Sequence, residues 1–140
     1  MSRIFWDTNI FIYLFESYGE LSDRAVNLRR RMLDRGDQLL TSTLTLGEIL
    51  VKPLERGEKQ LARKYEEGIT SAALLLPFDV KAAKQYAELR RDRSLRAPDA
   101  IQLACASAAG ADLFITNDAR LGTKRVEGIQ FITSIETAPI

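Results

Sequence analysis

Residues 3–15 read RIFWDTNIFIYLF, and the fold of the chain is built around this stretch. An apolar run ends at Trp6, three polar residues follow, and a second apolar run starts at Ile10 without an intervening glycine or proline. The pattern predicts a buried strand that leads through a turn into a helix. Asp7 would then stand at the carboxyl end of that strand, so its surroundings decide what it does.

The length and composition of the chain predict one globular domain that spans residues 1–140. A chain of 140 residues that is 46% hydrophobic and 28% charged can bury a core without disulfides. Lys and Arg number 20 against 19 Asp and Glu, so the net charge of +1 neither requires nor excludes a nucleic-acid partner. The distribution of the charges therefore matters more than their sum.

The cysteine content and the apolar segments favour the cytoplasm. The one cysteine, Cys105, cannot form an internal disulfide, and we expect it to be a packed thiol in a reducing compartment. No apolar segment reaches the roughly 18 residues that a membrane span needs, and Asp7 interrupts the region where a signal peptide would be apolar. We expect neither membrane insertion nor export.

Histidine is absent, which excludes several chemistries. The chain can hold neither a Ser-His-Asp nor a Cys-His arrangement, and it has no His-ligated zinc site. Any metal must be held by oxygen. The sequence also lacks a Walker-type or dinucleotide-binding glycine pattern, so a phosphate-cradling loop is not expected.

Strand and helix patterns alternate along the whole chain. This alternation predicts an α/β fold, a three-layer α/β/α sandwich around a mostly parallel central sheet of about five strands. Ligands of such sheets bind beyond the carboxyl ends of the strands. The predicted strands are residues 3–6, 38–42, 72–76, 113–116 and 129–132. The predicted helices are 11–16, 22–35, 43–50, 58–70, one capped by Asp79, and one that starts near Pro98 and ends before Gly110.

Particular residues are expected to fix the ends and faces of these elements. Ser22 is predicted to cap the second helix, and Pro53 to end the third. Residues 72–76 are predicted to form a buried strand, because they are an apolar run bounded by a proline. The inner face of the helix after residue 79 is expected to consist of Val80, Ala83 and Ala87.

Four carboxylates stand near the predicted strand ends. Asp7 follows the first strand, and Glu48 lies in the first turns of the helix after the second. Asp99 opens the helix before the fourth strand, and Asp118 follows that strand. Each has a structural explanation, because an acid near a helix amino terminus is stabilised by about 0.3 to 1 kcal/mol. Glu48 completes a capping box with Thr45, and the aspartates suit caps or turns.

Taken together, the four acids point to a metal site, because they can converge on one edge of the sheet. Two carboxylates about 4 Å apart repel by roughly 4 kcal/mol at an effective dielectric of about 20, so such a cluster should bind protons or a cation. Ligands that are all oxygen suit Mg²⁺ or Mn²⁺. A metal so held activates a water and neutralises charge on a phosphodiester, which is nuclease chemistry. The residues expected to support the acids by hydrogen bonds are Thr8, Asn9, Thr116 and Asn117, although turn chemistry alone also explains Thr8 and Asn9.

Arginines gather on the second predicted helix and after the fifth. Arg29, Arg30 and Arg31 lie in a helix whose basic residues outnumber its acidic ones, and Arg96 belongs to a second basic patch. These four side chains are candidate contacts to RNA phosphates. The alternative is that they form a solvated helix surface.

Four short motifs together resemble a known family. They are Asp7-Thr8-Asn9 after an apolar strand, a lone Glu48 in a Thr-rich helix start, Pro98-Asp99-Ala100 at the start of a small-residue helix, and Thr116-Asn117-Asp118 after a late strand. Their order and spacing are similar to those of PIN domains. The size and layout of the chain resemble the VapC-type toxins of toxin-antitoxin pairs.

The resemblance implies a metal-dependent endoribonuclease that acts as the toxin of a type II toxin-antitoxin system. It implies that Asp7, Glu48, Asp99 and Asp118 hold Mg²⁺ or Mn²⁺, and that Thr116 helps to position a metal-bound water. It also implies a homodimer and a small antitoxin protein whose tail covers the active site. Arg120 stands where some relatives carry a further acid.

Three other functions fit parts of the pattern. A non-catalytic RNA-binding or interaction module on the same fold would have no need for all four acids. A haloacid-dehalogenase-type phosphatase would need a second aspartate two residues after Asp7, where Asn9 stands. A receiver-like signalling domain would carry its phosphorylated aspartate after a middle strand. A divalent-metal titration of RNA cleavage separates the enzyme from the binding module.

Overall fold

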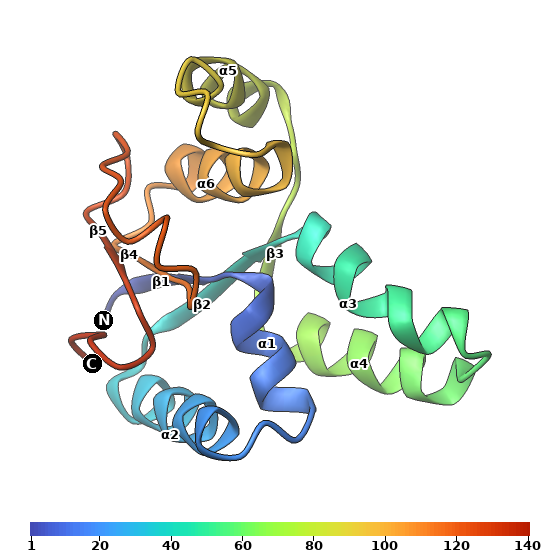
Figure 1. Cartoon of the computed structure of the whole chain (residues 1–140). Helices are drawn as coiled ribbons and strands as arrows, with labels where there is room; N and C mark the ends of the chain where they lie inside the picture. Colours follow the sequence, from blue (N-terminus) through green and yellow to red (C-terminus); the bar gives the residue numbers. More distant parts are fainter.

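A computed structural model describes all 140 residues, and a parallel sheet of five short strands lies at its centre (Figure 1). The strand order is β3-β2-β1-β4-β5. The strands are β1 (Arg3–Trp6), β2 (Gln38–Ser42), β3 (Leu74–Leu76), β4 (Leu113–Ile115) and β5 (Phe131–Thr133). The helices are α1 (Thr8–Phe15), α2 (Glu20–Arg35), α3 (Thr43–Glu55), α4 (Lys59–Ala72), α5 (Val80–Leu89) and α6 (Ala97–Ala109). None of these helices has the length and apolar composition that crossing a membrane requires. The predicted α/β fold is confirmed, and the sheet is parallel throughout.

Helices cover both faces of the sheet and form the outer layers of the predicted sandwich (Figure 1). Ile4 and Trp6 of the central strand pack with residues of α1 to α4, whereas Phe5 packs with residues of α5 and α6. All three side chains are fully buried. Phe5 pairs in register with Phe114 of β4, and their rings stack with centroids 5.0 Å apart. A strand covered on both faces must be apolar at every position, which explains the uninterrupted run before Asp7.

The carboxyl ends of the strands meet at one edge of the sheet. The backbone N–H of Asp7 donates to the Ile115 carbonyl at 3.0 Å, and that of Thr116 donates to the Thr133 carbonyl at 3.0 Å. These bonds extend the pairing just past β1 and β4 and place the two loops side by side. Because all strands run the same way, the segments after β1, β2 and β4 open at this one edge, which we call the acidic edge.

The start of α2 differs from the prediction. The helix begins at Glu20 and not after Ser22, because Gly19 adopts a positive φ of 60° and turns the chain into the helix earlier. The Ser22 hydroxyl instead donates to the Glu16 carbonyl and accepts from the Tyr18 N–H, both at 2.8 Å. Ser22 therefore ties the connection between α1 and α2 together.

The end of α3 and the nature of β3 also differ. Pro53 lies inside α3, which continues to Glu55. A proline removes its own hydrogen bond to the carbonyl four residues earlier, and in the last turn little else is lost. The predicted buried strand at 72–76 is shorter and lies at the edge of the sheet, with Leu74 47% exposed.

The inner face predicted for α5 is wrong. Val80 is 72% exposed, and Ala83 and Ala87 are exposed as well. Ala82 is buried, and Leu89 packs against the core beneath α6. Alanines stand on both possible faces of this helix, so the sequence pattern could not decide between them, and packing against α6 decided it.

Candidate functional site

Asp7 follows β1 and caps α1. Its Oδ1 accepts from the Thr8 N–H at 2.8 Å, and its Oδ2 accepts from the Thr116 hydroxyl at 2.7 Å. The residue is 8% exposed. Burial is the main reason that the pKa of Asp7 is raised to about 6; the hydrogen bonds oppose the rise, and the charges of Asp99 and Glu48 add to it. The carboxylate therefore does cap the helix, but it does so where its ionised form is disfavoured.

Glu48 lies in the second turn of α3 and contacts the start of α1. The Thr8 hydroxyl donates to Glu48 Oε1 at 2.6 Å. The predicted capping box with Thr45 does not form, because α3 begins at Thr43 with Ser42 as its N-cap, and Ser42 Oγ accepts from the Thr45 N–H at 3.3 Å. Glu48 has no role in capping α3, so the structural explanation offered for it does not hold.

Gln102 of α6 is a site residue that the sequence patterns missed. Its Nε2 donates to the Thr45 hydroxyl at 2.7 Å and to the Thr8 hydroxyl at 3.1 Å, and its Oε1 accepts from the Ser42 hydroxyl. Because Gln102 donates to the Thr8 oxygen, the Thr8 hydrogen is free to point at Glu48, its nearest acceptor. Gln102 is 2% exposed. The available signal was a lone amide in a helix of small and apolar residues.

Arginines hold the other two acids. The Arg120 guanidinium donates to both oxygens of Asp118, at 3.0 Å from Nε and 2.5 Å from Nη2. Arg96 Nε lies 3.5 Å from Asp99 Oδ2, and each guanidinium reaches the other aspartate at 4.0 Å. The hydrogen bond from Arg120 is the main reason that the pKa of Asp118 is lowered. Arg96, predicted to contact RNA, thus lies at the acidic edge itself.

The four predicted supporting residues connect the loops after β1 and β4. Thr116 bridges two of the acids, because its hydroxyl donates to Asp7 and accepts from the Asp118 N–H at 3.1 Å. The Asn9 amide oxygen accepts from the Asn117 N–H at 3.3 Å. Asn117 also donates from its side chain to the Tyr13 hydroxyl at 3.0 Å, so both asparagines brace the turns and do not bond to the acids. Thr8 serves Glu48, as described above.

The four acids share one edge of the sheet but do not form a closed metal cage as they stand. No group of three or more acidic side chains is gathered tightly enough to hold a metal ion. Arg96 and Arg120 lie between two of the acids, and both guanidinium-bearing side chains are mostly exposed, so they can turn away. The donor chemistry does fit Mg²⁺ or Mn²⁺, because every donor is oxygen and a cation would favour ionised Asp7. The predicted four-carboxylate metal site stays a prediction.

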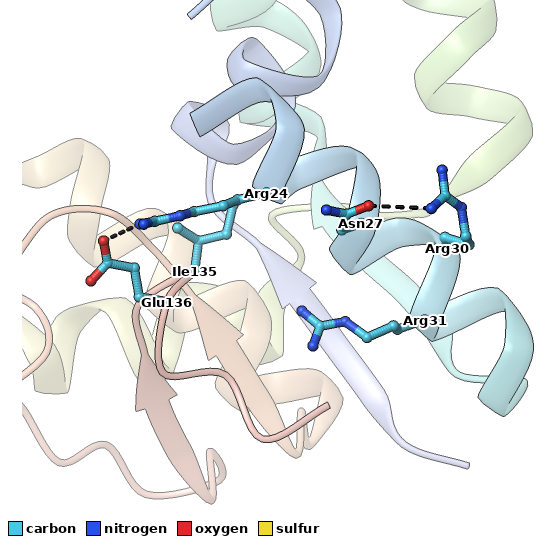
Figure 2. A pocket seen from close by; sticks show the side chains of 6 residues that line it. All are labelled: Arg24, Asn27, Arg30, Arg31, Ile135 and Glu136. Atoms are coloured by element: carbon cyan, nitrogen blue, oxygen red, sulfur yellow. Dashed lines mark hydrogen bonds and ion pairs between the residues drawn. The ribbon is translucent and has the colours of Figure 1, made fainter. Parts of the chain in front are cut away.

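The predicted RNA-contacting arginines of α2 lie on a helix apart from the four acids. Arg30 and Arg31 line a surface hollow (Figure 2). Arg29 does not line it; its Nη1 is buried without a hydrogen-bond partner, and burial lowers the pKa of Arg29. The structure therefore separates three neighbours in sequence into two different environments.

Solved structures of toxin-antitoxin complexes share this fold. One match is the structure of VapBC2 from Rickettsia felis bound to a promoter DNA fragment, with a TM-score of 0.76 and 18% identity. The match covers 94% of this chain and 98% of the matched chain. DNA-bound VapBC from Salmonella typhimurium covers 96% and 99% with a TM-score of 0.74 and 22% identity. VapC20 of Mycobacterium tuberculosis, a toxin that cleaves the sarcin–ricin loop, covers 79% and 86% with a TM-score of 0.61 and 18% identity. At such identities the likeness establishes the fold alone.

The sequence itself establishes the family. No curated protein matches it closely enough to count as a relative. Residues 4–127 match the family model of the PIN domain, and this stretch contains all four acids of the edge described above. The match covers most of the 140 residues. The chain belongs to the PIN domain family.

Proposed function

We propose that this protein is a metal-dependent endoribonuclease and the toxin of a type II toxin-antitoxin pair, with a single nuclease domain over residues 1–140. The observation that carries the proposal is the state of Asp7, a buried carboxylate with a pKa of about 6 at the same edge as three more acids. Burial and like charges both disfavour its ionised form, and a cation reverses that preference. Oxygen donors without histidine favour Mg²⁺ or Mn²⁺ as that cation.

In this function Asp7, Glu48, Asp99 and Asp118 would hold the ion. The ion supplies an activated water and neutralises negative charge on the RNA phosphodiester when bound. This chain contributes oriented carboxylates: the Thr116 hydroxyl fixes Asp7 at 2.7 Å, and a threonine of α1 fixes Glu48 at 2.6 Å. Each bonded carboxylate oxygen keeps a second lone pair for a ligand.

The two arginines at the acidic edge suit a phosphate substrate. Arg96 and Arg120 are mostly exposed, and planar guanidinium groups bind phosphate through two parallel hydrogen bonds. Their present partners, Asp99 and Asp118, are the acids that would turn to a metal. Exchange of carboxylate for phosphate would leave each arginine paired and free the two acids at the same time.

A partner protein is part of the proposal. The similar VapBC structures are complexes of toxin with antitoxin, and we propose that this chain likewise binds a small antitoxin protein and forms a homodimer in the cytoplasm. A groove of about 260 Å³ lies beside Glu48, between α1, α3 and α4. Apolar residues form half of its lining, including Ile12 and Val51. A peptide tail in this groove would reach the acidic edge.

RNA cleavage under metal control tests the proposal. Purified protein is incubated with single-stranded and structured RNA in Mg²⁺, in Mn²⁺ and in excess chelator, with Asp99→Asn as a second arm. We expect cleavage only with a divalent ion, and none by the variant. Cleavage that persists in chelator contradicts the metal mechanism. RNA binding without cleavage in any metal would identify a non-catalytic module instead.

A further inference from the structure

A second polar hollow, distant from the four acids in sequence, lies between α2 and the segment that follows β5. Its volume is about 540 Å³, and one of its six lining residues is apolar. Figure 2 shows the side chains of α2 on one side and those of the final segment on the other. We call it the arginine hollow. Its lining residues are Arg24, Asn27, Arg30, Arg31, Ile135 and Glu136.

Positive charge in the arginine hollow is only partly neutralised. Arg24 pairs with Glu136 across the hollow and lies 3.5 Å from Glu20 on its own helix. Arg30 donates only to the neutral Asn27 amide oxygen, at 3.2 Å. Arg31 lies within 4.0 Å of no carboxylate. Three guanidinium groups therefore face one carboxylate, and two of them carry no counter-charge.

β5 connects the arginine hollow to the acidic edge. Ile135 is buried and anchors the segment that forms one wall. Two residues before it, the Thr133 carbonyl accepts from the N–H of Thr116, whose hydroxyl holds Asp7. The end of β5 thus joins the acidic edge to the wall of the arginine hollow.

We propose that the arginine hollow binds the sugar-phosphate backbone of the RNA, away from the bond that is cut. The identity of the ligand rests on the proposed function. Arg30 and Arg31 bind phosphate oxygens directly. Arg24 exchanges Glu136 for a phosphate. Arg31 lies seven positions after Arg24 in the helix, roughly 10 Å along the axis, which is long enough for more than one phosphate.

The lining favours RNA over a protein partner. Stable protein interfaces are built on a buried apolar or aromatic centre, and the hollow offers Ile135 alone, which is already covered. A phosphate backbone needs no such centre, because its affinity comes from charge and released counterions. The groove beside Glu48 has the apolar lining that the hollow lacks.

Salt-dependent RNA binding tests the proposal. The full chain is held in excess chelator, so that labelled single-stranded RNA stays intact, and binding is followed by fluorescence anisotropy. Removal of both free arginines, in Arg30→Ala/Arg31→Ala, should weaken binding about tenfold and flatten the slope of log K against log salt by about 1.4. The control is Lys81→Ala/Lys84→Ala, two exposed cations of α5 on the opposite face of the sheet. Equal effects of the two double variants, or none, overturn the proposal.

A variant with the opposite sign sharpens the test. Glu136→Gln removes the only carboxylate that lines the arginine hollow and leaves Arg24 with Glu20 alone, so RNA binding should tighten several-fold. Glu88→Gln is the control, because Glu88 forms an exposed pair with Arg91 on α5. Unchanged or weaker binding by Glu136→Gln contradicts the proposal.

These experiments distinguish a failure of the arginine hollow from a failure of the proposed function. RNA binding that depends on Arg30 and Arg31, without any cleavage in divalent metal, would support the arginine hollow and contradict the nuclease function. Metal-dependent cleavage, with RNA binding that does not change when both arginines are removed, would support the nuclease function and contradict the arginine hollow.

Discussion

The two halves of the acidic edge hold their carboxylates in opposite ways. Asp7 and Glu48 receive hydrogen bonds from neutral donors, namely backbone N–H and threonine hydroxyl groups. Asp99 and Asp118 face guanidinium groups. The pKa of Asp7 is accordingly raised, mainly by burial, whereas the pKa of Asp118 is lowered, mainly by its hydrogen bond from Arg120.

We expect the two halves to contribute differently to metal binding. The half that contains Asp7 and Glu48, the neutral half, has no cation beside it to stabilise its charge. The half that contains Asp99 and Asp118, the paired half, already has two arginines. A metal ion should therefore gain most of its binding free energy from Asp7, and the arginines should compete with it for Asp99 and Asp118. Loss of Asp7 should therefore have a large effect, and loss of an arginine from the paired half a small one.

The largest effect is expected from Asp7→Asn. It keeps the shape of the side chain but removes the charge, so RNA cleavage should fall by at least about 10³-fold because metal and water activation are lost together. Single-turnover cleavage rates measure this. Asp79→Asn is the matched control, since Asp79 is also a helix N-cap with a hydrogen bond from the Ala82 N–H. Comparable losses in the two variants would show that Asp7 acts only as a cap.

The pH dependence of stability should reveal the same residue in metal-free protein. The ordinary pKa of an aspartate is 3.8, and burial raises the pKa of Asp7 to about 6 in the folded protein. Between these pH values Asp7 binds more protons in the folded state than in the unfolded state. The stability that protonated Asp7 contributes is therefore lost as the pH rises from about 4 to 6. Since one pKa unit corresponds to about 1.4 kcal/mol, ionised Asp7 destabilises the folded protein by about 3 kcal/mol above pH 6.

Urea unfolding in chelator at several pH values measures this contribution as a difference between two proteins. Asp7→Asn should be more stable than the unmodified chain at pH 7.5, and the two should converge below about pH 4. A gap that does not change with pH would show that Asp7 does not titrate as the burial of its carboxylate requires.

A smaller effect is expected from Gln102→Leu. The variant keeps the volume but leaves the hydroxyls of Ser42, Thr45 and Thr8 without their amide partner, which should cost about 2 kcal/mol of unfolding free energy. Cleavage should fall as well, because the Thr8 hydroxyl is no longer directed at Glu48. Gln60→Leu, at an exposed position of α4, provides the control for urea unfolding. Equal stability of the two variants would contradict the role given to this network.

The smallest effect is expected from an arginine of the paired half. Arg120→Met removes a cation that competes with metal, so the Mn²⁺ concentration for half-maximal binding should fall by about fivefold, the range of an exposed ion pair. Arg91→Met removes an arginine that pairs with Glu88 on α5 and should change nothing. A higher Mn²⁺ requirement for Arg120→Met would show that Arg120 supports the metal site.

The sequence predicts the structure best where one residue type has one consequence. The apolar run of β1 required burial on both faces, and that fixed the sheet, the position of Asp7 and the edge where the other acids gather. Features that depend on packing between distant elements could not be predicted from the sequence. Alanines on both faces of α5 gave no preference. Gln102 acquires its role only because α6 lies across the start of α3, and no spacing along the chain encodes that contact.

Mn²⁺ binding measured by isothermal titration calorimetry tests whether Asp7 holds a metal ion, and it needs neither a substrate nor a partner. The unmodified chain, Asp7→Asn and Asp79→Asn are titrated at pH 7.5, above the pKa of Asp7. We expect the unmodified chain and Asp79→Asn to bind Mn²⁺, and Asp7→Asn to have lost this binding. No binding by the unmodified chain, or equal binding by all three proteins, would contradict this expectation.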